Sequence, residues 1–333
     1  MLDIKGKIVN ILKNEVVPAT GCTEPVAIAL AGAKAKELFG DDDFDSAIVL
    51  TSANVFKNAL CVGIPNCEYT GLNYAAALGL SKGNSKDDLR ILEEIKDEHK
   101  LLADQYVTMG KIKLGIADVS DSVYIVVELK SANNYSKAII KGKHNNFVHL
   151  ESKKDGIIVS DKTRSSNIKV DNDESIYDLK VVDIISQIEK IAFEDIEFLL
   201  EGITMNENAA KLALNSKLGI GVGYGIKTNM EKGLIAKDLI NTAMMLTAAA
   251  SDARMSGLDI PVMSSNGSGN HGLTAILPIV AFREVMPDTS DEKLATALAI
   301  SHIITGCIKR RTGRLTPLCG CGVAAGVGSA VAI

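Results

Sequence analysis

Three glycine-rich segments bring together polar side chains that could do chemistry in this 333-residue chain. They are Thr20-Gly21-Cys22-Thr23-Glu24-Pro25, residues 264–272 (Ser-Ser-Asn-Gly-Ser-Gly-Asn-His-Gly), and residues 307–322, which end in Leu318-Cys319-Gly320-Cys321-Gly322. Each segment leads into an apolar stretch typical of a buried helix. The free N–H groups and the dipole at a helix N-terminus stabilise negative charge, so each segment is a candidate site for a thiolate or an anionic substrate.

The cysteines of the first and third segments are candidate metal ligands. Cys22 precedes a predicted helix whose dipole favours the thiolate, and Cys319 and Cys321 form a Cys-x-Cys pair. Such a pair is a weaker signal than two Cys-x-x-Cys pairs. A zinc site needs four ligands, which Cys22, Cys307, Cys319 and Cys321 would supply. The alternative is that these cysteines are buried, inert thiols.

The second segment supplies the candidate catalytic residues. By its type and position, His271 is expected to be the general base, with Ser268 and Asn270 beside it. Gly267 and Gly269 would let the backbone approach a substrate closely, and the N–H groups of this segment would bind the substrate carboxylate. The alternative is a break in packing between two helices, with His271 engaged in structural hydrogen bonds.

A basic group follows the last predicted long helix and consists of Lys309, Arg310, Arg311 and Arg314. Positive charge is favoured at the C-terminal end of a helix, so one interpretation is a solvated helix end. The other is that Arg310 and Arg314 bind the carboxylate of a substrate.

The elements that must position these segments are of two kinds. Residues 41–174 contain β-branched strand patterns at 45–52 and 123–129, followed by a hairpin signal around Asn133-Asn134, and a charged amphipathic helix is predicted over 84–99. These patterns predict a module built around an antiparallel sheet.

The remaining residues, 1–40 and 175–333, have helical spacing, with apolar helices predicted over 239–255 and 293–306. The predicted fold class is therefore α+β, with an all-helical catalytic domain into which the sheet module is inserted. The alanine-rich helices would accommodate a homodimer.

Composition narrows the class of protein. Hydrophobic residues make up 47% and charged residues 23% of the chain, as in ordinary globular proteins. The net charge of −5 gives no support for nucleic-acid binding. The sequence shows neither a signal peptide nor an apolar run of about 18 residues that could span a membrane, so a cytoplasmic protein with no membrane partner is expected.

Several segments are similar to those of L-cysteine desulfidases, a family related to the helical subunit of iron–sulfur L-serine dehydratases. The similar segments are Gly21-Cys22-Thr23-Glu24-Pro25, Asn54-Val55-Phe56-Lys57-Asn58 with Gly63-Ile64-Pro65, Ser251-Asp252-Ala253-Arg254-Met255, residues 265–278, and Leu318-Cys319-Gly320-Cys321. They occur in the family's order and extend over nearly the whole chain.

The resemblance implies a [4Fe-4S] cluster held by three cysteines, with an open position at the fourth iron. Cys22 would be one ligand, and Cys319 or Cys321 a second, with Cys319 favoured. In this family the third ligand lies in a Cys-Asp-Gly segment further downstream, which this sequence does not contain, so we interpret the sequence as a truncation.

The implied function is β-elimination of L-cysteine, a small amino-acid substrate, to hydrogen sulfide, pyruvate and ammonia. A soft thiolate leaving group suits an open iron site. One alternative is the same elimination on L-serine, in which only the leaving atom differs. The other is an inactive metal-binding homologue, because the third ligand is missing.

Overall fold

The computed structural model describes residues 4–21, 23–155, 157–163, 174–258, 260–313 and 315–333. The chain divides into two compact units. One comprises residues 22–170 and 315–317 and is called the sheet unit below. The other comprises residues 1–21, 171–314 and 318–333 and is called the helical unit. The α+β class expected from the sequence is confirmed.

The sheet unit contains a six-stranded sheet in the order β3-β2-β4-β5-β6-β7. Its strands are β2 (Ser46–Thr51), β3 (Ile112–Ile116), β4 (Tyr124–Lys130), β5 (Tyr135–Lys141), β6 (Phe147–Lys154) and β7 (Ile157–Thr163). Burial alternates along β2 and β5, as expected for strands with one covered face. The sheet therefore has one covered face.

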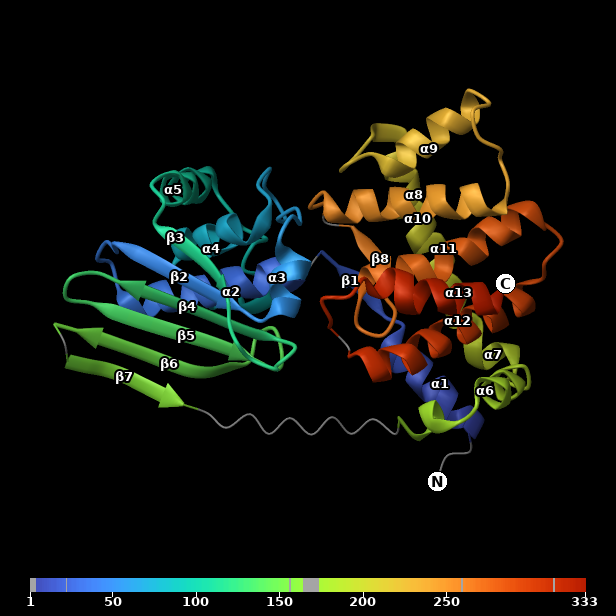
Figure 1. The fold of residues 1–333 in the computed structure, drawn as a ribbon, viewed down its shortest axis with the longest axis horizontal. Coiled ribbons are helices and arrows are strands. Elements are labelled where there is room, and N and C mark those ends of the chain that lie inside the picture. Colours follow the sequence, from blue (N-terminus) through green and yellow to red (C-terminus); the bar gives the residue numbers. More distant parts are fainter. Residues whose placement is uncertain (1–3, 22, 156, 164–173, 259, 314) are drawn as a thin grey trace. The chain divides into compact units, whose positions relative to one another are not determined.

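Helices α2 and α4 cover one face of this sheet (Figure 1). The helices of the unit are α2 (Thr23–Phe39), α3 (Ala53–Ala59), α4 (Gly71–Lys82) and α5 (Asp97–Thr108). A Cβ on Gly79 of α4 would lie only 2.7 Å from the Cα of Ala29 in α2. Small residues thus let the two helices approach closely over the sheet.

Two details of this unit differ from the sequence prediction. The sheet is mixed rather than antiparallel, because β2 pairs in parallel with β3 while the other neighbours are antiparallel. The helix predicted over 84–99 is instead a short 3₁₀ turn (Asp88–Arg90) followed by α5. Ile91 and Leu92 are buried, but they lie in a turn that follows the 3₁₀ segment. Their helix-like spacing therefore does not reflect an α-helix.

Among the described residues, the helical unit contains nine α-helices, which Figure 1 labels, and one π-helical turn. They are α1 (Ile4–Glu15), α6 (Val181–Ile188), α7 (Phe193–Ile196), α8 (Glu201–Ser216), α9 (Val222–Glu231), α10 (Leu239–Met255), α11 (Gly269–Val285), α12 (Asp291–Thr312), a π-helical turn (Cys321–Ala325) and α13 (Gly326–Ala332). Helix α10 packs between α8 and α11, and α12 packs against α11 and α13.

The helical unit differs from the predicted all-helical domain in two respects: it contains two short paired strands, and it does not include helix α2. Strand β1 (Pro18–Thr20) pairs antiparallel with β8 (Pro261–Met263), which joins the first glycine-rich segment to the second. Helix α2 packs against the sheet and belongs to the sheet unit, whereas the sequence analysis grouped residues 1–40 with the helices. Among the described residues, no helix is long and apolar enough to cross a membrane.

Candidate active site around His271

A tight hairpin turn forms the start of the segment 264–272. Ser265 and Ser268 exchange backbone hydrogen bonds of 3.0 and 3.2 Å, and the two residues between them have positive φ angles, 50° at Asn266 and 79° at Gly267. These features define the two-residue turn for which Asn-Gly is the preferred sequence. Gly267 therefore serves the turn geometry, and the N–H of Ser268 is used inside the protein rather than for a ligand.

Helix α11 begins immediately after this turn. The Ser268 hydroxyl accepts a hydrogen bond from the backbone N–H of His271 at 3.5 Å, which caps the helix. The N–H of Gly272 also donates to the Ser268 carbonyl, at 3.1 Å. Among the described residues, the N–H groups of Gly269 and Asn270 have no acceptor, as is usual in a first helical turn. Only part of the predicted anion-binding backbone is thus available.

The imidazole of His271 lies against the third glycine-rich segment. His271 is 9% exposed, and a Cβ on Gly320 would lie 2.5 Å from its Cε1 and closer still to its Nε2. Gly320 separates Cys319, which is exposed, from Cys321, which is partly exposed. The structure therefore brings the second segment against the third, while Cys22 lies outside the described residues.

Lys309 closes the other side of the imidazole. Its side chain is 5% exposed, and its Nζ donates to the Asn266 carbonyl at 2.6 Å and lies 2.9 Å from Nδ1 of His271. The sequence analysis chose Arg310 and Arg314 from the same basic group. Arg310 is exposed, and Arg314 lies outside the described residues. The cation beside His271 is thus Lys309, which the sequence analysis left unassigned.

Arg254 of α10 is a second buried cation that the sequence analysis did not select. It is 7% exposed, donates to the Asn270 side-chain oxygen at 3.0 Å, and donates to the Gly21 carbonyl. A Cβ on Gly269 would lie 2.5 Å from Arg254 Nε. Packing against Arg254 is therefore one reason for a glycine at this position. Arg254 belongs to the segment Ser251-Asp252-Ala253-Arg254-Met255, which resembles the L-cysteine desulfidases, and this resemblance could have identified it.

His302 of α12 contacts the turn through the Ser265 hydroxyl, and its imidazole is neutral near pH 7. It is 2% exposed, and its Nδ1 lies 2.8 Å from the Ser265 hydroxyl. Burial lowers the pKa of His302 from 6.5 to about 3.

This burial has a consequence for stability against pH. In the unfolded chain the His302 imidazole takes up a proton near pH 6.5, but in the folded protein only near pH 3. Between these values the unfolded state binds more protons, so the free energy of unfolding should fall with decreasing pH, by up to about 1.4 kcal/mol per unit. Urea unfolding at pH 7 and pH 5.5 should show a smaller loss for His302→Gln than for the wild type. An equal loss in both would contradict the assigned burial effect.

The cysteines fit a thiolate-bound metal group only in part. Cys319 and Cys321 supply two thiols at the start of a helical turn, which is the donor type that iron–sulfur clusters prefer. Burial raises the pKa of the Cys307 thiol to about 11, which disfavours its thiolate and the predicted zinc set. The described residues contain no group of three potential ligands, and the third candidate, Cys22, is not among them.

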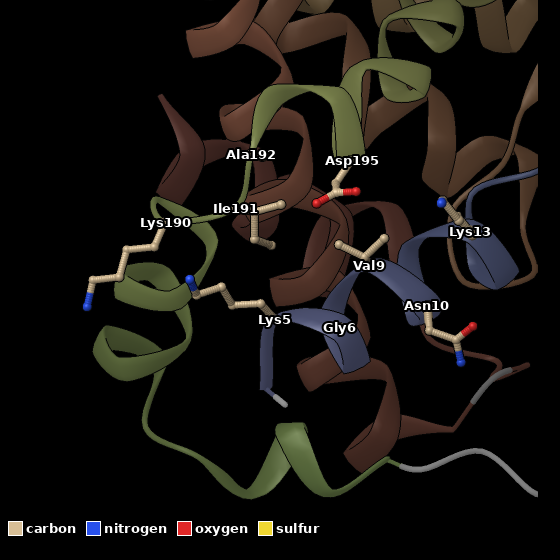
Figure 2. Close-up of a pocket in the computed structure, with 9 residues that line it drawn as sticks. All are labelled: Lys5, Gly6, Val9, Asn10, Lys13, Lys190, Ile191, Ala192 and Asp195. Atoms are coloured by element: carbon tan, nitrogen blue, oxygen red, sulfur yellow. The ribbon is translucent and has the colours of Figure 1, made fainter. Parts of the chain in front are cut away.

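A surface pocket of about 520 Å³ lies elsewhere in the helical unit. Figure 2 shows that α1 contributes Lys5, Gly6, Val9, Asn10 and Lys13, opposite Lys190, Ile191, Ala192 and Asp195. None of the predicted site residues lines this pocket. Two of its lysines, Lys13 and Lys190, are exposed, and the residues around His271 remain the candidate site.

Comparison with known proteins places this site in a family. The model of the serine dehydratase alpha chain family matches residues 86–333, so the chain belongs to this family, which consists of iron–sulfur-dependent lyases of the dehydratase type. A UPF0597 protein of Clostridioides difficile (strain 630) is 52% identical over 326 residues, 97% of this chain and 75% of the relative. A UPF0597 protein of Alkaliphilus oremlandii (strain OhILAs) is 47% identical over 332 residues, 100% of this chain and 76% of the relative. No solved structure matches the chain.

Proposed function

We propose that this protein eliminates hydrogen sulfide from L-cysteine, with pyruvate and ammonia as the other products, using a [4Fe-4S] cluster. The family supports an iron–sulfur lyase. The observation that carries the proposal is the contact between Gly320 and the His271 ring. It places the Cys319-Gly320-Cys321 segment next to a buried imidazole, whose Nδ1 contacts the buried Lys309 Nζ.

Among the described residues, Cys319 and Cys321 are the candidate ligands that would hold the cluster. When bound, such a cluster supplies a Lewis acid for a soft thiolate leaving group. The chain's own residues perform the rest. His271 transfers a proton. Ser268 caps the N-terminus of α11, the helix to which His271 belongs. The N–H groups of Gly269 and Asn270 bind the substrate carboxylate. Arg254 fixes the Asn270 side chain in this arrangement.

The experiment is a substrate comparison with anaerobically purified, iron-reconstituted protein. Sulfide and pyruvate released from L-cysteine, and pyruvate released from L-serine, would be measured at matched concentrations. We expect kcat/KM to be at least about 10-fold higher on L-cysteine, because a thiolate needs less acid assistance to leave than hydroxide. A higher kcat/KM on L-serine would favour the dehydratase alternative, which the family description supports. Iron-loaded protein that releases pyruvate from neither would contradict the proposal.

A further inference from the structure

We propose that Lys309 holds the His271 imidazole in the tautomer that carries its proton on Nε2, so that His271 gives a proton in the elimination instead of taking one. The catalytic role rests on the proposed function, whereas the tautomer does not. The sequence analysis expected His271 to be a general base, so this inference assigns it the opposite role.

The tautomer follows from the chemistry of the two groups. The Lys309 Nζ lies 2.9 Å from His271 Nδ1, within hydrogen-bond distance. Lys309 is taken as the ammonium, which has three donors and no acceptor, so that Nδ1 is the acceptor in this hydrogen bond. A neutral imidazole has one N–H, and with Nδ1 accepting, that N–H is on Nε2.

Lys309 is held in place by the backbone carbonyl of Asn266, whose own position is fixed by hydrogen bonds. Its Nζ also donates to the Asn266 carbonyl at 2.6 Å. Asn266 is in turn fixed by two hydrogen bonds of 3.0 Å, from its N–H to the Glu15 carbonyl and from its side chain to the His302 carbonyl. The tight turn at Asn266 and Gly267 therefore also orients the Asn266 carbonyl toward the Lys309 Nζ.

The opposite edge of the ring faces the cysteine segment. Gly320 leaves room for His271 Nε2, and a Cβ there would overlap the ring. With the proton on Nε2, the imidazole presents an N–H donor at the edge that lies against Gly320. The departing sulfur of the substrate is expected on this side, because a thiolate leaving group is to be captured there.

The resulting step balances as follows. The electron pair of the substrate Cβ–S bond leaves with the sulfur, which receives the Nε2 proton of His271. The electron pair of that N–H bond remains on the imidazole, and Lys309 transfers a proton to Nδ1 and becomes a neutral amine. A proton from water then returns to Nε2 while the Nδ1 proton returns to Lys309, which restores the ammonium and the Nε2–H imidazole and leaves hydroxide. The Cα proton of the substrate goes to a group other than His271, and Lys309 acts as a positioning residue through His271.

The tautomer can be measured directly by two-bond ¹H–¹⁵N correlation spectra of protein labelled with ¹⁵N-histidine, before and after cluster loading. The peaks that disappear in His271→Gln identify His271. We expect the Nε2–H pattern in the wild type and a mixture of tautomers in Lys309→Met. An exposed lysine of the surface pocket supplies the matched control, so Lys190→Met should leave the pattern unchanged. A wild-type Nδ1–H pattern would overturn the proposal, even if Lys309→Met failed to fold.

Kinetics separate this role from a merely structural one. General acid catalysis contributes about 10²–10⁴-fold, so Lys309→Met should lower kcat on L-cysteine by at least about 100-fold with little change in KM. Lys309→Arg, whose guanidinium is also only a donor, should restore part of the loss. A loss of kcat without a change of tautomer would refute the positioning role. If wild-type protein shows the Nε2–H tautomer but no elimination, the proposed function fails and the tautomer stands.

Discussion

Replacing Gly320 by alanine is expected to lower kcat/KM for the elimination by at least about 100-fold. The backbone at Gly320 has an ordinary helical φ of −62°, so alanine causes no backbone strain. Its Cβ, however, would lie 2.5 Å from His271 Cε1, well inside the distance of about 3.5–4.0 Å at which carbon atoms pack. The imidazole must move, and a displacement of this size is enough to disturb proton transfer.

The neighbouring glycine supplies the control for this experiment. A Cβ on Gly322 meets nothing within 4 Å, so Gly322→Ala should keep kcat/KM within about 3-fold of the wild type. Steady-state sulfide release and circular dichroism on both variants would test the pair. Equal activity of Gly320→Ala and Gly322→Ala, with both folded, would show that the His271 contact is not used in catalysis.

Replacing Gly272 by alanine is expected to reduce the free energy of unfolding by about 3 kcal/mol or more. Gly272 lies in the first turn of α11, where a Cβ would be 2.7 Å from the Cα of Ser264 and closer still to the Met263 carbonyl oxygen. Overpacking usually costs about 1–3 kcal/mol, and more when backbone must shift. Here the shift would separate α11 from β8.

The matched control for stability is Gly225→Ala in α9, where a Cβ meets nothing within 4 Å. Alanine at an interior helical position should raise the free energy of unfolding by up to about 1 kcal/mol. Urea unfolding of both variants should show a lower free energy of unfolding for Gly272→Ala and a higher one for Gly225→Ala. A Gly272→Ala protein as stable as wild type would mean that α11 is not held as closely against β8 as the structure shows.

The sequence predicted those elements whose patterns are local. Helix α10 covers residues 239–255 exactly as expected from its apolar spacing, and β4 and β5 form the hairpin that the Asn133-Asn134 signal indicated. Strand β3 was missed, because its parallel partner β2 is reached only through three helices. Pairing at that sequence separation leaves no local signal.

The candidate site was predictable in its segments but not in all its residues. His271 and the Cys319-Gly320-Cys321 segment were named, and they lie together. Lys309 was passed over for Arg310, although a signal existed. Residues 302, 306 and 309 share one face of a helix, and His302 and Gly306 are buried, so Lys309 points inward while Arg310 is rotated away. The contact of that face with the turn at Asn266 is tertiary, and no spacing within α12 encodes it.

The most direct test of a cluster site beside His271 is the iron bound per chain after anaerobic reconstitution. The wild type, Cys319→Ser, Cys321→Ser and a Cys61→Ser control should be compared at equal protein concentration, since Cys61 is exposed and lies in the sheet unit. We expect Cys319→Ser, Cys321→Ser or both to lose at least about half of the bound iron, and Cys61→Ser to retain all of it. If both Cys319→Ser and Cys321→Ser bind as much iron as the wild type, this segment does not hold the cluster.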